Sequence, residues 1–425
     1  MNMRTACASF LAAVVQIRRA RVCIFFVTVL AAVSVTSQSG WASSMMVHIG
    51  RMAAIAISGE TAIERLSRGN GLAAKGDLEG AIVEFRAALR INPNFFEAHN
   101  NLGNALKAKG DVKGAITEYR AALRINPDSS QSHYSLGNLL KTEGDVEGAI
   151  AEYRTALRIN PNLAEPHYNL GNALLEHGDV EGAIAEYRAA LRIKPNFAEP
   201  HYNLGKVLLE AKGDVEGAIA ECRAALRINP DFAEAHGNLG NALRAKGDAK
   251  GAIAEYRAAL RINPNSAEAH GNLANLLLEG GDVEGAMAEY RATLQINPNL
   301  AGAHANLGNA LKAKGDVEGA ISEYRAALRI DPNLAEPHYN LGNLLLEGDD
   351  VEGAIAEYRA ALRINPNLAE AHLSLASVLE EKGDLAPALE EYRLAYQLKP
   401  SDIGLRAKEG IERLSHKTSK QTIPQ

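Results

Sequence analysis

The chain has 425 residues, of which 47% are hydrophobic and only 5% aromatic, and its formal net charge is -6 at pH 7. A single compact core rarely grows to this size, so the length favours several domains or a repeat array. The negative charge argues against a general affinity for nucleic acid, and we expect no nucleic-acid partner.

Residues 1–43 form an N-terminal segment whose composition differs from the rest. Its only charges are arginines between positions 4 and 21, followed by an apolar run at 22–35 and small residues around Ala42. This order is typical of a secretory signal peptide, and the run is shorter than the ~20 residues of a membrane-spanning helix. We predict export, to the periplasm or outside the cell. The alternatives are an uncleaved membrane anchor through residues 22–35 and, if the start site is misassigned, a cytoplasmic protein.

A linker at 44–61 leads into a sequence that repeats every 34 residues from 62 to 402. A period of this length fixes the architecture, because each repeat must be one small structural unit that stacks on its neighbours. Residues 164–197 serve here as the reference unit, with positions numbered 1 to 34. The ten units, of which the fifth has one extra residue, begin at Ala62, Phe96, Ser130, Ala164, Ala198, Ala233, Ala267, Ala301, Ala335 and Ala369.

Each unit is predicted to hold two helices. The first has apolar or small residues at positions 4, 7, 8 and 11, which share one helical face, and it stops at Gly178, a residue that tolerates positive φ. Asp179 caps the second helix, which buries positions 20, 24 and 27 and ends before Pro195. Glu165 follows Asn162 by three residues and predicts a capping box at the next helix start.

Position 8 is glycine in most units, for example Gly171. Glycine inside a helix costs ~1 kcal/mol relative to alanine, so its recurrence predicts an offsetting close approach of the two helices near position 20. A large side chain at Gly171 is therefore expected to overpack this contact.

A 34-residue unit with small residues at positions 8 and 20, an aromatic residue at 24 and proline at 32 resembles the tetratricopeptide repeat. The resemblance implies an all-α, right-handed superhelical solenoid of helix-turn-helix repeats. Two units depart from the pattern. The first is degenerate, with Arg65 and Arg68 where apolar residues are expected, and the ninth has Asp349 in place of the position-15 glycine. Residues 403–425 are predicted to form a capping helix and a flexible tail, with the helical pattern running from Asp402 to Leu414.

Histidine recurs at position 4 of nine units, which suggests either a ladder of metal ligands or a packing residue. Equivalent residues of stacked repeats should lie ~10 Å apart, too far to share one zinc ion at ~2 Å per bond. We therefore predict a packing role and no metal or other cofactor. The residues are His99, His133, His167, His201, His236, His270, His304, His338 and His372.

Asparagine recurs at positions 6 and 9 of the first helix, which share a face. An amide both donates and accepts, so it suits a peptide backbone. The resemblance places this face in the concave groove, and a similar asparagine ladder occurs in the repeat region of O-linked N-acetylglucosamine transferase. Solvated surface and hydrogen bonds between neighbouring repeats are the alternatives. Together with tyrosines at position 5, the predicted peptide-binding residues are Asn101, Asn104, Tyr134, Asn138, Tyr168, Asn169, Asn172, Tyr202, Asn203, Asn238, Asn241, Asn272, Asn275, Asn306, Asn309, Tyr339, Asn340 and Asn343.

Repeats three to five combine both residue types and are predicted to form the main peptide site. The fold is expected to survive replacement of Asn169, Asn172 and Asn203, on the premise that they lie away from the helix-packing face.

Arginines such as Arg188 and Arg192 are predicted to form a solvated outer face balanced by Glu181 and Glu186. Cys222, in the position-24 place of tyrosine, is predicted to be a buried, inert thiol.

No nucleophile–base arrangement, phosphate-binding loop or metal-ligand cluster occurs in the sequence, so we predict no enzyme activity. The predicted function is a non-catalytic scaffold that binds an extended peptide or protein partner in the concave groove. The alternative is the substrate-recognition portion of a glycosyltransferase, similar to O-linked N-acetylglucosamine transferase, without its catalytic domain. A metal-binding histidine solenoid is a third hypothesis.

Overall fold

The computed structural model describes residues 61–398 and 402–421. The predicted signal peptide or membrane anchor at 1–43 lies outside these residues. Every element that the structure describes is an α-helix, and consecutive helices pack in pairs as a solenoid of repeats. None of the described helices combines the length and the apolar composition needed to span a membrane.

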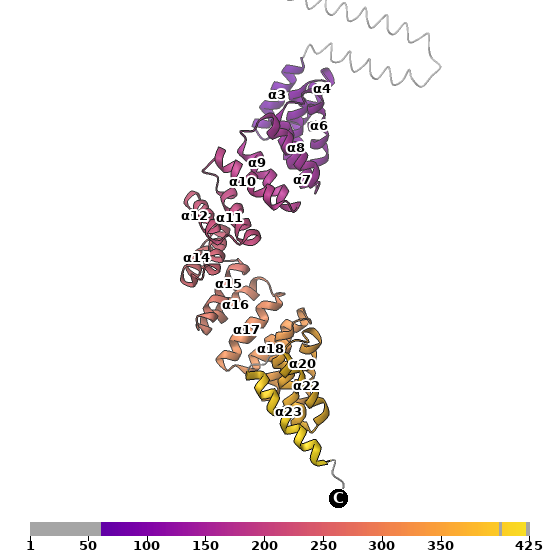
Figure 1. The fold of residues 1–425 in the computed structure, drawn as a ribbon. Helices are drawn as coiled ribbons and strands as arrows, with labels where there is room; N and C mark the ends of the chain where they lie inside the picture. Colours follow the sequence, from indigo (N-terminus) through magenta and orange to yellow (C-terminus); the bar gives the residue numbers. More distant parts are fainter. Residues whose placement is uncertain (1–60, 399–401, 422–425) are drawn as a thin grey trace, which may run out of the picture. The chain divides into compact units, whose positions relative to one another are not determined.

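The chain divides into two compact units, which meet between Pro195 and Asn196. Odd-numbered helices are the first helices of the repeats and even-numbered helices are the second (Figure 1). The first unit contains α3 (Ala62–Ala74), α4 (Leu78–Ile91), α5 (Phe96–Ala108), α6 (Val112–Ile125), α7 (Ser130–Thr142), α8 (Val146–Ile159), α9 (Ala164–Glu176) and α10 (Val180–Ile193).

The second unit continues the same alternation and ends in one additional helix, α23. Its helices are α11 (Ala198–Lys212), α12 (Val215–Ile228), α13 (Ala233–Ala245), α14 (Ala249–Ile262), α15 (Ala267–Glu279), α16 (Val283–Ile296), α17 (Ala301–Lys314), α18 (Val317–Ile330), α19 (Ala335–Glu347), α20 (Val351–Ile364), α21 (Ala369–Lys382), α22 (Leu385–Leu398) and α23 (Asp402–Gln421).

The turn between the two helices of a repeat is made as predicted. Gly178 has φ 88°, a left-handed conformation that glycine adopts without steric strain. Asp179 then caps α10, where its Oδ1 accepts a hydrogen bond from the Gly182 amide at 2.9 Å. The glycine–aspartate pair therefore stops one helix and starts the next within three residues.

The predicted capping box at the start of the next repeat is wrong. α9 begins after Leu163, which makes no side-chain cap hydrogen bond, and Glu165 instead forms an ion pair with Lys194 at 3.0 Å. A hydrogen bond earlier in the connection between the repeats is present instead: Asn160 Oδ1 accepts from the Asn162 amide at 3.1 Å. Because an apolar side chain occupies the cap position, the carboxylate has no reciprocal partner there.

The close approach predicted at position 8 is confirmed, and the tyrosine at position 24 accounts for most of it. A Cβ atom on Gly171 would lie 2.7 Å from Tyr187 Cε1 and 3.3 Å from the Ala183 carbonyl oxygen. Tyr187 and Ala183 are both fully buried. Glycine is therefore retained because the aromatic ring lies directly on the backbone of the first helix.

Replacement of Gly171 with leucine is expected to lower the free energy of unfolding by about 1–3 kcal/mol, because the new side chain must displace the buried Tyr187 ring. Urea unfolding measures the effect. The matched control is Gly71→Leu in α3, where nothing lies within 4 Å of the Cβ position. At Gly71 the stability should stay the same or rise, because leucine favours a helix more than glycine does. Equal changes at the two positions would contradict overpacking at Gly171.

The ninth repeat contains a strained turn. Asp349 has φ 63° and is the only residue other than glycine with positive φ in the described part of the chain, while the neighbouring Gly348 has φ -92°. We expect Asp349→Gly to raise the free energy of unfolding by about 1 kcal/mol, since the left-handed conformation costs an L-residue ~1–2 kcal/mol. In the control Asp331→Gly, at φ -133°, the same change should destabilise. A stability loss at Asp349 as well would contradict this account.

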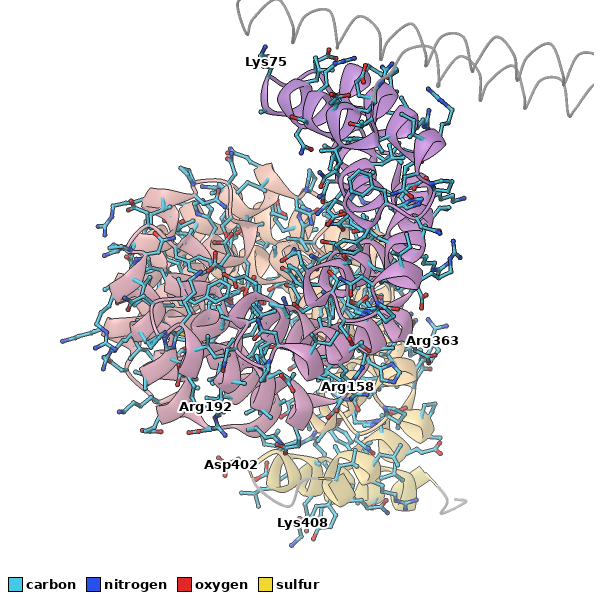
Figure 2. All side chains as sticks on the ribbon, turned by 90° about the horizontal axis from the view of Figure 1, so that it is seen from above. Lys75, Arg158, Arg192, Arg363, Asp402 and Lys408 are labelled. Atoms are coloured by element: carbon cyan, nitrogen blue, oxygen red, sulfur yellow. The ribbon has the colours of Figure 1, made fainter. Side chains whose placement is uncertain are left out.

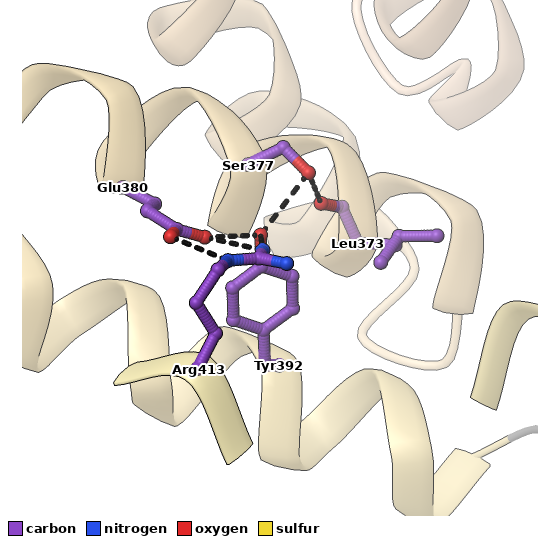
Figure 3. A network of polar contacts seen from close by, with 5 residues as sticks. All are labelled: Leu373, Ser377, Glu380, Tyr392 and Arg413. Carbon is purple, nitrogen blue, oxygen red and sulfur yellow. Dashed lines mark hydrogen bonds and ion pairs between the residues drawn. The ribbon is translucent and has the colours of Figure 1, made fainter. Parts of the chain in front are cut away.

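The last helix, α23, covers the tenth repeat. Its Ala407 and Leu414 are fully buried, and a Cβ atom on Gly410 would lie 2.7 Å from the Tyr392 ring of α22. Polar groups support this contact (Figure 3), since Arg413 donates to both carboxylate oxygens of Glu380 at 2.8 and 2.7 Å. The helix extends to Gln421, beyond the Leu414 end predicted from the pattern.

Candidate binding face

In seven repeats, a tyrosine hydroxyl from the second helix reaches the asparagine at position 9 of the same repeat. The hydroxyl donates to the asparagine Oδ1 at 2.6–2.8 Å, while the tyrosine ring itself is buried. The pairs are Tyr119–Asn104, Tyr153–Asn138, Tyr187–Asn172, Tyr256–Asn241, Tyr290–Asn275, Tyr324–Asn309 and Tyr358–Asn343.

The asparagine at position 6 joins this contact from the following repeat. Its Nδ2 donates at 2.8–3.1 Å to the position-9 Oδ1 atom, so one amide oxygen can receive two donors. The pairs are Asn101–Asn70, Asn169–Asn138, Asn272–Asn241, Asn306–Asn275 and Asn340–Asn309. The asparagine ladder therefore forms hydrogen bonds between neighbouring repeats, which was one of the alternatives left open by the sequence.

The premise that these asparagines lie away from packing contacts is wrong. Asn172 accepts from the buried Tyr187, and Asn169 donates to Asn138 at 2.9 Å and to the Tyr134 hydroxyl at 3.1 Å. The tyrosine at position 24 crosses the repeat, so its hydroxyl emerges beside the first helix. Peptide binding at the ladder stays a prediction, but survival of the fold without these residues is no longer expected.

The tyrosines at position 5 are half-buried packing residues. Tyr134, Tyr168 and Tyr339 each contact the position-24 tyrosine of their own repeat, with ring centroids 6.0, 6.1 and 6.0 Å apart. Tyr202 packs instead on Phe232, at 4.9 Å, because its repeat carries Cys222 at position 24. Asn203 lies on α11 and is half-buried. Tyr134 and Tyr168 belong to the first unit, and Tyr202 and Asn203 to the second.

Each position-4 histidine binds a glutamate on the second helix of its own repeat. The Nδ1–Oε2 distances are 2.5–2.6 Å. The glutamates, at position 23, are Glu118, Glu152, Glu186, Glu221, Glu255, Glu289, Glu323, Glu357 and Glu391. The histidines thus pack between the helices, as predicted, and each one also forms a hydrogen bond between the two helices of its repeat.

The second ring nitrogen of these histidines holds the connection to the preceding repeat. In His167, Nε2 lies 3.0 Å from the Pro161 carbonyl oxygen, and the corresponding contact recurs at His99, His133, His236, His270, His304, His338 and His372. A carboxylate and a carbonyl can only accept hydrogen bonds, so both nitrogens donate when the ring is protonated. A protonated histidine therefore links the first helix to the second helix of its repeat and to the connection from the preceding repeat.

The pKa values of His167 and His372 are raised. Burial by itself lowers them, but the hydrogen bonds to Glu186 or Glu391 and to the proline carbonyl outweigh it. In the first repeat Arg65 occupies position 4 and binds Glu84 at 3.0 Å, which explains this departure from the pattern. Within the described residues, no three histidine, cysteine or acidic side chains are grouped so as to hold a metal ion.

The outer face carries arginines at positions 25 and 29 of most repeats. Arg158, Arg192 and Arg363, labelled in Figure 2, lie at the ends of second helices, where a positive charge also stabilises the helix dipole. Glu186, predicted to balance this face, instead binds His167.

Burial, followed by the nearby Glu221 carboxylate, raises the pKa of Cys222 to about 12, so this thiol stays protonated at neutral pH.

Each unit has a hollow lined largely by first-helix residues. The hollow in the first unit has a volume of about 320 Å³ and lies over Phe85, between Asn70, Asn101 and Asn104. The hollow in the second unit has a volume of about 120 Å³ and lies between α11, α13 and α15. Both occur where a repeat departs from the common pattern.

Comparison with known families identifies the repeat. A family model described as the TPR repeat matches residues 69–110, 103–144, 137–178, 171–211, 209–247, 240–279, 274–315, 308–349 and 342–383. A second model, described as the tetratricopeptide repeat, matches residues 369–402. The chain belongs to the tetratricopeptide-repeat family.

Solved structures with a similar fold include Pseudomonas aeruginosa PilF, at 24% identity and TM-score 0.45, covering 49% of this chain and 94% of that one. A tetratricopeptide repeat protein from Parabacteroides merdae has 18% identity, TM-score 0.44 and coverage of 60% and 100%. Yeast Tom70 has 13% identity, TM-score 0.39 and coverage of 85% and 97%. No curated protein matches the chain. The family models support the tetratricopeptide repeat but show no closer similarity to O-linked N-acetylglucosamine transferase.

Proposed function

We propose that this protein is a non-catalytic scaffold that binds an extended segment of a protein partner on its first-helix face. This face comprises the side chains at positions 2, 5, 6 and 9 of the repeats. The observation that carries the proposal is that the hollow in each unit is lined by first-helix residues, including asparagine amides and, in the second unit, Tyr202. Amides and tyrosine rings together suit a peptide backbone and its side chains.

Site-specific photo-crosslinking on the full chain tests this proposal. The crosslinking amino acid p-benzoylphenylalanine replaces Gly271, at position 5 of α15, or Ala185, at an exposed position of α10. Open space surrounds the Gly271 Cβ position, with no atom nearer than 3.8 Å. Partners captured from cell extract should crosslink through Gly271. Crosslinks obtained only through Ala185 would place binding on the outer, arginine-bearing face instead.

We further propose that residues 1–43 direct export, on the basis of the arginines that precede the apolar run at 22–35. Fusion of residues 1–60 to a reporter enzyme that is active only outside the cytoplasm should give activity. Replacement of the leader arginines with glutamate should reduce that activity. A reporter that stays inactive with the native leader would refute the export proposal.

A further inference from the structure

The hollow in the second unit is a pocket created by a missing side chain. Position 5 of the sixth repeat is Gly237, whereas the third, fourth, fifth and ninth repeats have tyrosine there. In those with a tyrosine at position 24 as well, the two rings pack together, as Tyr134 does on Tyr153. Nothing lies within 4 Å of the Cβ position of Gly237, so the buried Tyr256 ring lines the pocket.

The pocket has room for a partner's side chain. Its volume is about 120 Å³, whereas one water molecule needs roughly 10–15 Å³ of such space. A ring at position 5 would occupy this space, because Ala259 and Asn272 line the pocket together with Tyr256. The missing ring at Gly237 therefore leaves the space beside Tyr256 open to a ligand.

Asn238, which lines the same pocket, carries a buried hydrogen-bond donor. Asn238 Nδ2 is buried and has no hydrogen-bond partner. In five other repeats the position-6 amide donates to the position-9 asparagine of the preceding repeat, but here that residue is Lys206. The Tyr202 hydroxyl lies near Asn238 without the geometry of a hydrogen bond. An unsatisfied buried donor costs about 1–3 kcal/mol, so an incoming acceptor would bind favourably.

The charge around the pocket is predominantly negative. Glu210, Glu234 and Glu268 line it together with the single cation Lys206, and none of these four takes part in a described ion pair. Burial raises the pKa of Tyr202, and the carboxylates of Glu234 and Glu268 raise it further. The pocket therefore favours a cation.

We propose that this pocket receives an arginine side chain of an extended peptide. The guanidinium would lie between Glu234 and Glu268 and against the Tyr202 ring, while a peptide carbonyl of the same segment accepts the hydrogen bond from Asn238 Nδ2. Arginine fits this lining better than lysine, because its planar group both stacks on aromatic rings and donates to carboxylates in a fork. The inference rests on the proposed function, since it names the residue that the bound segment presents.

The test is selection of twelve-residue peptides from a random phage-displayed library on the full chain. Recovered peptides are synthesised with each arginine retained or replaced by citrulline, which keeps the shape but removes the charge. We expect enrichment of arginine and loss of about tenfold or more in affinity with citrulline, the size expected for a charged hydrogen bond. Spermidine serves as the free cation for comparison.

Two protein variants locate the contact. Gly237→Tyr places in the pocket a side chain that other repeats already carry at this position, so the fold should accept it. It should weaken binding by about tenfold or more. Ala254→Tyr is the control, because Ala254 is exposed on α14 of the same repeat but lies outside the first-helix face and does not line the pocket. It should change the affinity by less than about twofold.

Two kinds of failure can be told apart. Peptides that bind Gly237→Tyr as tightly as the native protein, or that tolerate citrulline, would overturn the pocket assignment and leave the proposed function intact. Binding of spermidine without recovery of any peptide would make the occupant a small cation and overturn the inference. Recovery of no peptide and no binding of spermidine would overturn the proposed function as well.

Discussion

Replacement of Asn138 with alanine is expected to lower the free energy of unfolding by about 2–3 kcal/mol, although the residue lies on the surface side of its helix. Its Oδ1 accepts from the Tyr153 hydroxyl at 2.7 Å and from Asn169 Nδ2 at 2.9 Å. Alanine leaves both donors without this acceptor, and an unsatisfied buried donor costs about 1–3 kcal/mol. Native-state hydrogen exchange of repeats three and four, compared with urea unfolding, measures the loss.

The chain supplies a matched control for this prediction. Asn104 accepts from the Tyr119 hydroxyl at 2.6 Å, but position 6 of the following repeat is Ser135 instead of asparagine, and this serine lies beside the same hydroxyl. Asn104→Ala should therefore destabilise less than Asn138→Ala. Addition of Tyr153→Phe to Asn138→Ala should recover part of the loss, because the hydroxyl without an acceptor is removed. Equal effects at Asn138 and Asn104, with no recovery, would contradict the ladder as a source of stability.

The melting temperature is expected to fall as the pH rises from 6 to above 8. His167 and His372 have raised pKa values in the folded protein, because their hydrogen bonds to Glu186 or Glu391 and to a proline carbonyl outweigh the effect of burial. The folded state therefore binds protons more tightly than the unfolded chain, whose histidines titrate near ~6.5. This contribution to stability is fully present below about pH 6.5 and is lost as the pH rises through the folded pKa.

Histidine titration followed by NMR measures the pKa values directly, and thermal unfolding at several pH values measures their effect on stability. Glu186→Gln combined with Glu391→Gln keeps a side-chain oxygen but removes the charge, so it should lower both pKa values and flatten the pH dependence. A melting temperature that rises with pH between 6 and 8 would have the opposite sign to this account. If the melting temperature of the double variant still depends on pH to the same extent, these two ion pairs are not the cause of that dependence.

The helix pattern could be predicted from the sequence because its signals are local. Glycine at position 15, aspartate at 16 and proline at 32 act within a few residues, and the reference unit accordingly forms α9 and α10. The capping-box prediction was wrong because it considered the spacing of Asn162 and Glu165 alone. Leu163 occupies the cap position, and its apolar side chain makes no cap hydrogen bond. Asp349 is recognisable in the sequence as a departure from the repeat. Only its positive φ shows that the residue is strained, so that glycine is expected to stabilise the turn.

The polar contacts between helices could not be predicted in the same way, because they join residues 15 to 35 positions apart. A signal was nevertheless present. Glutamate occupies position 23 in every repeat, and the repeat that lacks the position-4 histidine has Arg65 instead. Likewise the fifth repeat lacks both the position-9 asparagine, replaced by Lys206, and the position-24 tyrosine, replaced by Cys222. Variation among repeats of one chain thus indicates contacts between positions.

The pocket depends on residues that are absent, which periodicity does not reveal. Gly237 and Lys206 appear in the sequence as two unrelated exceptions, on different repeats. Only the arrangement of α11 and α13 shows that Gly237 leaves a pocket beside the buried Tyr256 and that Lys206 removes the acceptor of Asn238. The departures from the repeat therefore mark the place where we expect a partner to bind.

The double variant Lys206→Asn, Gly237→Tyr tests this central claim most directly, because it restores the common repeat at the pocket. The introduced asparagine would supply the acceptor that Asn238 lacks, and a buried hydrogen bond contributes about 1 kcal/mol. We therefore predict a higher free energy of unfolding together with loss of binding to an arginine-containing peptide selected on the native protein. A titration in which the stabilised double variant binds that peptide with native affinity would contradict the account.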